Sequence, residues 1–443
     1  GLARPEATLV GEGGVFGMGR VSHASMVFGA DGTLHVVCCV NGVSRYASHP
    51  TPSALTSGAW VAGDLPFDKG VRPYDLEQLG GRVAVIGAGM TRFGKLLDKS
   101  IKDLVREATE EAIKDAGIDK KDIQAAYVGN AVAGLMTGQE MIRGQVTLTS
   151  MGIDSIPIFN VESACASSSS AFHLGWAATG AGLYDTVLVV GFEKLYDKDK
   201  KKSFMALGTA VDLELVLEYF QKAETALAKE DRIMHEGSGE KRSIFMDMYA
   251  WMTRRYMNMY GLTQEHFAKL SVKAHKNGAF NPHAQYQEEV TLEEVLQSGD
   301  VSFPLTRMMC SPVGDGAAAV VLSSKSTAAN QTTKPVWVAA SVVGSGKITN
   351  DPDDTLTRRL APKVYEAAGS GPEDVVVIEV HDATSPAEIM DLIELDICRG
   401  EDAPKWIDEG VFEIDGRKPS NPSGGLVTKG HPIGATGCGQ IYE

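Results

Sequence analysis

The feature that most constrains the fold is a short pattern that occurs twice in the chain. Residues 115–123 and 367–375 share alanine, glycine and aspartate at matching positions, with a constant offset of 252 between them, as from Gly117 to Gly369. Each copy leads into an apolar segment of the kind that forms a buried strand. A duplicated pattern predicts two similar α/β halves, one starting near Val83 and one near Pro335, with a site between them.

The first copy belongs to a strand–helix–strand pattern, which is typical of α/β proteins. Residues 83–89 predict a buried strand, residues 101–116 a helix that ends at Gly117, and residues 125–128 a second strand. The glycines of the first strand match a dinucleotide-binding motif poorly, because the next one, Gly94, is too far along the chain. We therefore do not expect a nicotinamide cofactor.

The 443 residues are enough for two or three domains. Residues 1–80 are expected to form a β-rich N-terminal extension, to which we attach no chemistry. Residues 81–330 form the first half, with a helical insertion at about 195–285 that acts as a lid. Residues 331–443 form the second half, which we expect to be incomplete at its C-terminal end. Methionines and aromatics at helical spacing in residues 244–260 indicate core packing or an adaptable apolar tunnel.

Charge and cysteine content exclude several functions. The net charge of −15 argues against binding to nucleic acid or to an anionic membrane. No apolar run approaches the roughly 18 residues that a membrane helix needs. Six scattered cysteines without Cys-x-x-Cys pairs argue against disulfides and zinc, and favour a reducing, cytoplasmic location. One basic cluster, residues 194–202, indicates either a solvated loop or a phosphate-binding site.

Four residues stand where reactive groups are expected. Cys165 lies between an extended stretch and a helix rich in small residues, where free N–H groups stabilise a thiolate. His381 follows a predicted strand, and His431 and Cys438 lie in the glycine-rich segment 430–440. Taken singly, Cys165 fits an inert buried cysteine and each histidine fits a structural one. The joint occurrence of these motifs favours catalysis.

In their order along the chain, these motifs resemble the thiolase family, and its sterol-carrier-protein type in particular. The resemblance covers about residues 83–443 and includes the Cys165 turn, His381-Asp382, Gly430-His431-Pro432 and Cys438 in a Cys-x-Gly motif. It implies a five-layered αβαβα fold and assembly as a homodimer. It also implies that the protein is an acyltransferase that acts on acyl-CoA in lipid metabolism. The substrates would be acyl-CoA and coenzyme A, with no metal and no tightly bound cofactor.

The resemblance also implies a role for each residue. Cys165 would attack an acyl-CoA thioester and hold the acyl group. His431 would take the thiol proton, His381 would bind the enolate oxygen, and Cys438 would act as the second acid or base. We further expect Gly434 and the lysines of the basic cluster to bind substrate; these lysines are Lys200, Lys201 and Lys202.

Two alternatives remain open at the level of the sequence. A condensing enzyme of the ketoacyl-synthase kind also uses one cysteine and two histidines. A non-catalytic or partner-dependent thiolase-like subunit, working with a small OB-fold protein, would fit the expected short C-terminal end. The family often has Cys-Phe where this chain has Ala383-Thr384, so the acyl pocket is expected to differ.

Overall fold

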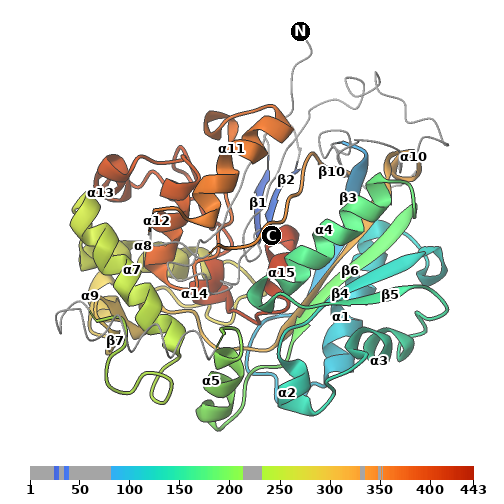
Figure 1. Cartoon of the computed structure of the whole chain (residues 1–443), viewed down its shortest axis with the longest axis horizontal. Helices are drawn as coiled ribbons and strands as arrows, with labels where there is room; N and C mark the ends of the chain where they lie inside the picture. The colour runs from blue at the N-terminus through green and yellow to red at the C-terminus, as the bar shows by residue number, and fades with distance from the viewer. Residues whose placement is uncertain are drawn as a thin grey trace.

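The computed structural model describes residues 24–28, 34–38, 81–212, 232–329, 335–347, 351 and 353–443. Its centre is a six-stranded mixed sheet in the order β10-β3-β9-β6-β4-β5 (Figure 1). Strands β3, β6, β4 and β5 run in one direction, while β9 and β10 run in the opposite one. The strands are β3 Val83–Met90, β4 Ala125–Gly129, β5 Ile158–Val161, β6 Thr186–Glu193, β9 Gly316–Ser324 and β10 Val336–Val338.

Helices cover both faces of this sheet. Helices α1 (Ile101–Ala116) and α3 (Arg143–Thr149) lie on one face, and α4 (Ser167–Gly180) and α15 (Thr436–Tyr442) lie on the other (Figure 1). Successive residues of β6 alternate between two apolar clusters, because neighbouring side chains in a strand point to opposite faces. Both faces are therefore buried, and the predicted strand–helix–strand pattern of the first half is confirmed.

The repeated pattern builds the same local structure twice. Helix α1 ends at Gly117 and α11 (Leu356–Ala368) ends at Gly369, both in the left-handed region with φ of 67° and 72°. A 3₁₀ turn follows each glycine, at residues 120–122 and 372–374. In each turn an aspartate accepts a backbone N–H three residues earlier, at 2.8 Å for Asp122 and 2.9 Å for Asp374. The local pattern of helix, glycine and 3₁₀ turn is thus repeated in the structure.

The second half forms fewer strands than its sequence predicts. The apolar segment ending at His381 makes one parallel bridge, between Ile378 and Ser420. A strand requires ladder partners along its length, and among the described residues this segment finds only residues 419–421. The five-layered arrangement therefore stays a prediction. The helices of this half are α11, α12 Ser385–Glu394, α13 Ala403–Asp408, α14 Gly425–Lys429 and α15.

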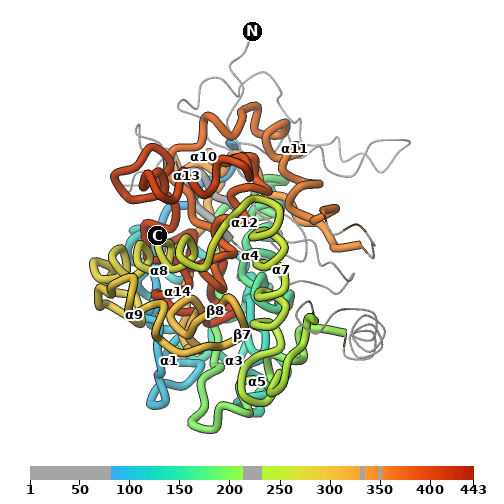
Figure 2. Tube along the Cα trace, turned by 90° about the vertical axis from the view of Figure 1, so that its left-hand side faces the viewer, coloured from blue at the N-terminus to red at the C-terminus, as the bar shows by residue number. Residues whose placement is uncertain are grey.

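The described part of the predicted insertion contains three helices, and residues 232–243 form turns. Helix α7 (Ile244–Tyr260) begins after the cap Ser243 and ends at Gly261, whose φ is 71°. It packs with α8 (Gln264–Gly278) against α12, and these three helices lie side by side in Figure 2. The shorter elements here are α5 Lys200–Gly208, α9 Leu292–Leu296, β7 Asp300–Ser302 and β8 Leu305–Thr306.

The N-terminal extension is described only at a hairpin. Strands β1 (Ala24–Phe28) and β2 (Leu34–Cys38) pair antiparallel, and β1 lies beside α15. The rest of the predicted extension, which ends at residue 80, lies outside the described residues. None of the described helices combines the length and the apolar character needed to span a membrane. Within the described residues, the remaining short helices are α2 Ala133–Thr137 and α10 Lys325–Ala328.

Candidate active site

The turn between β5 and α4 presents Cys165. A 3₁₀ turn at Ala164–Ala166 precedes α4, and Ala164 adopts a left-handed φ of 47°, which is strained for a residue with a side chain. Glu162 holds the turn by accepting the N–H of Ala164 at 2.6 Å. Ser167 donates to the carbonyl of Ala164 at 2.7 Å and accepts the N–H of Ser163. Cys165 is therefore held half-buried just before the first turn of α4.

His431 lies against this cysteine in its neutral form. Its Nε2 is 3.0 Å from the Cys165 Sγ, and its Nδ1 is 2.7 Å from the hydroxyl of Thr436. The Thr436 hydroxyl also lies 3.2 Å from the carbonyl of Pro432, and when it donates its proton there it accepts from Nδ1–H. The Nε2 lone pair is then left to face the thiol. Burial lowers the pKa of His431 to about 3, so the imidazole stays uncharged at neutral pH.

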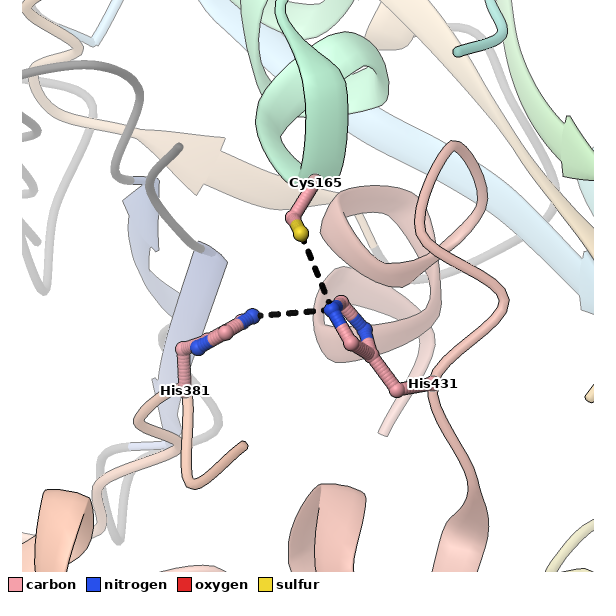
Figure 3. Close-up of side chains that lie close together, drawn as sticks. All are labelled: Cys165, His381 and His431. Carbon is pink, nitrogen blue, oxygen red and sulfur yellow. Dashed lines mark hydrogen bonds between the residues drawn. The ribbon is translucent and has the colours of Figure 1, made fainter. Parts of the chain in front are cut away.

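His381 completes the cluster from the second half of the chain. Its Nε2 lies 3.2 Å from the Nε2 of His431, and the two rings meet edge to face (Figure 3). The next residue, Asp382, accepts the backbone N–H of Leu426 at 2.6 Å, which fixes the His381 loop against α14. Two imidazoles and one thiol thus converge from three distant segments.

The same side chains would also suit a metal ion. One ligating atom each from Cys165, His381 and His431 lies within 4.8 Å of the others, and this donor set is one that zinc accepts. Both ring nitrogens of His431 already have protein partners in the arrangement of a base and its orienting group. That arrangement favours acid–base chemistry at the thiol.

A large cavity opens over the three side chains. Its volume is about 1330 Å³, and Cys165, His381 and His431 all line it. Six basic side chains line the cavity against three acidic ones, although the whole chain is acidic. Another part is apolar and is formed by Phe204, Phe245, Met246, Met248 and Met308. A molecule with an anionic part and an apolar part would complement both regions.

The predicted lysines separate into two groups. Lys200, at the start of α5, lines the cavity. Lys201 forms an ion pair with Glu240 at 3.1 Å, and Lys202 forms one with Asp197 at the same distance. The side chains of Lys201 and Lys202 are 66% and 61% exposed, so solvent screens both pairs. Only Lys200 of the three faces the cavity.

Gly434 serves packing in this structure. A side chain at this position would place a Cβ 2.5 Å from the carbonyl oxygen of Phe192, so only glycine fits. Its N–H donates to the buried carboxylate of Glu193 at 3.1 Å. Gly434 does not line the cavity, whereas its neighbour Ile433 does. A glycine is needed at this position because the His431 loop packs closely against β6.

Cys438 does not line the cavity, although its N–H donates at 3.1 Å to Ser168, three residues after Cys165. It lies on α15, fully buried in an apolar cluster with Met90, Phe93 and Phe172, and is not among the cavity-lining residues. Burial raises the pKa of its thiol to about 12, so the thiol stays protonated at neutral pH. The small residues after Cys165 have a related explanation: a Cβ at Gly437 of α15 would lie 2.2 Å from the Ser169 hydroxyl of α4. The small residues that follow Cys165 therefore allow α15 to pack closely against α4.

Two supporting residues were missed by the sequence reasoning. Thr436 orients His431, and the only signal was a hydroxyl five residues after that histidine. Glu193 accepts N–H groups from Ala131, Val132 and Gly434, which joins the first half to the His431 loop. Burial raises the pKa of Glu193 to about 7. An acidic residue at the end of an apolar strand was its only signal.

A thiol at a strand–helix turn, with two imidazoles beside it from a distant part of the chain, is a kind of site that cysteine-dependent acyl transfer uses. Residues 83–303 match the family model described as "Thiolase, N-terminal domain", and residues 341–443 match "Thiolase C-terminal domain-like". The chain belongs to the thiolase family and is an acyltransferase of that class. The resemblance drawn from the motifs is confirmed.

Named relatives agree with this family. An "Acetyl-CoA acetyltransferase" of Methanothermobacter thermautotrophicus is 37% identical over 82% of this chain and 89% of its own length. "Sterol carrier protein 2" of Gallus gallus is 33% identical over 82% of this chain and 65% of its own length.

Among solved structures, "Ltp2-ChsH2(DUF35) aldolase" has a TM-score of 0.61 at 24% identity, covering 82% of this chain and 89% of that chain. Human mitochondrial 3-ketoacyl-CoA thiolase in complex with CoA has a TM-score of 0.56 at 18% identity, covering 82% and 90%. At these identities the two structures support the fold alone.

Proposed function

We propose that this protein cleaves a 3-oxoacyl-CoA with coenzyme A, or runs the reverse Claisen condensation, through an acyl group on Cys165. The observation that carries the proposal is the 3.0 Å contact between the Cys165 thiol and a His431 nitrogen whose tautomer Thr436 sets. A thiol paired with an oriented neutral base is the arrangement that nucleophilic catalysis requires. Family membership favours this reaction over that of a ketoacyl synthase.

In the cleavage direction, His431 takes the Cys165 proton and the thiolate attacks the 3-oxo carbon. The bond between C2 and C3 breaks, leaving an acyl thioester on Cys165 and the enolate of acetyl-CoA. His381 donates to the enolate oxygen, and the proton held by His431 is returned to C2. Coenzyme A then attacks the acyl-Cys165 carbonyl, which regenerates the thiol and releases the shortened acyl-CoA.

The cavity supports acyl-CoA as the substrate class. Basic side chains at its rim, such as Lys200, suit the phosphates of coenzyme A, and the methionine-rich wall suits an acyl chain. Similar proteins include one named for acetyl-CoA and one solved in complex with CoA. Because methionine side chains are adaptable, this wall does not restrict the acyl group to one length.

The first experiment is intact-mass analysis after incubation with acetyl-CoA and with acetoacetyl-CoA. We expect one acetyl group per chain, mapped to Cys165, and no adduct on the Cys165→Ser variant. Cys398→Ser is the matched control, because Cys398 is buried outside the cavity lining, and it should be acetylated like the wild type. An adduct that persists in Cys165→Ser would refute the assignment of the nucleophile.

A partner-dependent form of the same activity is the second candidate. One solved structure of similar fold is named as a complex, "Ltp2-ChsH2(DUF35) aldolase". If acetylation of Cys165 occurs without turnover, adding a partner related to the DUF35 component of that complex should restore turnover. Full turnover by the isolated chain would exclude this candidate.

We also propose that two copies associate through the exposed edge of the sheet. Strand β5 is an edge strand whose Phe159 is 44% exposed, next to α3 and the loop holding Met141 (75% exposed) and Ile142 (57% exposed). An exposed edge strand beside apolar side chains is a surface that soluble proteins normally cover. A second copy, related by a twofold axis, would cover both edges at once.

A further inference from the structure

The segment 285–286 is fixed to the loop that leads into His431. The N–H of Gln285 donates to the carbonyl of Lys429 at 3.1 Å, and the N–H of Tyr286 donates to that of Thr428 at 3.0 Å. These bonds place the Gln285 side chain between two glycines. A Cβ at Gly430 would lie 3.1 Å from the Gln285 Oε1, and a Cβ at Gly314 would lie 2.7 Å from it. The amide therefore sits one residue away from the catalytic histidine.

The Gln285 amide has no hydrogen-bond partner within the described part of the chain. Its Oε1 and its Nε2 are both buried, and Gln285 lines the catalytic cavity. A buried amide left unsatisfied destabilises a fold, so such a group calls for an external partner. Gln287 provides the contrast, because it also lines the cavity but its Nε2 donates to the carbonyl of Asn281 at 2.7 Å.

We propose that Gln285 binds the amide of the thioester arm nearest to the reacting sulfur, as found in coenzyme A. The Gln285 Nε2–H would donate to the carbonyl of that amide, and Oε1 would accept its N–H. This inference rests on the proposed function and adds a specificity residue to it. Gln285 thereby makes the enzyme prefer thioesters whose thiol part carries an amide.

The chemistry of the two unpaired atoms restricts the ligand. One atom needs a donor and the other needs an acceptor, and this holds whichever way the amide is oriented. A thioester carbonyl or a phosphate offers only acceptors at neutral pH. A secondary amide offers both groups side by side, and Gln285 lines the same cavity as Cys165, beside the Gly430 that precedes His431.

The test combines a change in the protein with a change in the substrate. Acetylation of Cys165 is timed by intact mass with S-acetyl-N-acetylcysteamine and with its ester analogue, in which oxygen replaces the amide N–H. The wild type should react about 3- to 10-fold faster with the amide, the worth of one hydrogen bond. Gln285→Met should react equally with both, while its melting temperature stays the same or rises because two unsatisfied polar atoms are removed.

Gln287→Met is the matched control and should keep the preference for the amide. The proposal is wrong if Gln285→Met keeps that preference, or if the wild type has none. A lower melting temperature in Gln285→Met would show that the amide has a structural partner, and would also overturn it. Failure of the proposed function is distinguishable, since wild-type Cys165 would then not be acetylated by acetyl-CoA itself.

Discussion

Thr436 sets the chemistry of the site at the scale of a single residue. Its hydroxyl has one proton and lies within reach of both Pro432 and His431; when that proton goes to the Pro432 carbonyl, the hydroxyl accepts the Nδ1–H of His431. The other ring nitrogen is therefore a lone pair directed at the thiol. A histidine with the opposite tautomer would present a proton to Cys165 and would not serve as a base.

Thr436→Val should slow acetylation of Cys165 by about 10- to 100-fold, because the valine keeps the shape but leaves the tautomer unset. The rate is measured by quenched intact-mass analysis with acetyl-CoA. Thr436→Ser retains the hydroxyl and should remain within a few-fold of the wild type. Equal rates for the valine and serine variants would contradict the role of this hydrogen bond.

Cys438→Ala separates a structural role from a catalytic one. Because Cys438 lies in an apolar cluster outside the cavity lining, we expect acetylation and condensation rates within a few-fold of the wild type. The free energy of unfolding should fall by about 1 kcal/mol, owing to the small cavity that is left. Normal acetylation together with abolished condensation would instead restore Cys438 as the second acid or base.

At the scale of elements, α5 shows how helical geometry separates neighbouring lysines. Consecutive residues of a helix point about 100° apart, so side chains adjacent in sequence face different surroundings. Lys200 lines the cavity, whereas Lys201 pairs with Glu240. The cluster of lysines in the sequence does not reveal which of them faces the cavity.

Lys200→Ala should therefore raise the KM for acetyl-CoA several-fold, and the effect should shrink at high salt as phosphate attraction is screened. Lys201→Ala is the matched control and should leave KM unchanged. Reaction with S-acetyl-N-acetylcysteamine, which has no phosphate, should be insensitive to both changes. An equal effect of Lys200→Ala on this short thioester would exclude a role in binding phosphate.

At the scale of the whole molecule, the site depends on three segments that are distant in the chain. Cys165 comes from the first half, while His381 and His431 come from the second. Glu193 connects the two by accepting N–H groups from both sides. Neither half by itself therefore contains all three reactive groups.

The proposed homodimer is tested at this scale. Phe159→Asp places a charge on the exposed edge strand and should convert the dimer into a monomer, as measured by light scattering at equal concentration. Leu183→Asp, at an exposed position outside the β5 strand, should leave the dimer intact. A wild-type monomer, or a Phe159→Asp dimer, would rule out this edge as the interface.

Local elements were readable from the sequence because their signals are local. The helix over 101–116 follows from apolar spacing, and its end follows from a glycine that adopts a left-handed conformation. The same reasoning predicted α7 over Ile244–Tyr260. The second-half strand was less predictable, because a ladder needs partners that an apolar segment does not specify.

What the sequence by itself determined is the order of the elements, the family, and a short set of reactive residues. Only the tertiary structure decided which of these meet. Cys165 and His431 are 266 positions apart and in contact, whereas Cys438, only seven positions after His431, is fully buried against Ser168 and does not line the cavity. The physical reason is that backbone preferences act over a few residues, while a reactive cluster arises from long-range packing that a sequence pattern does not encode position by position.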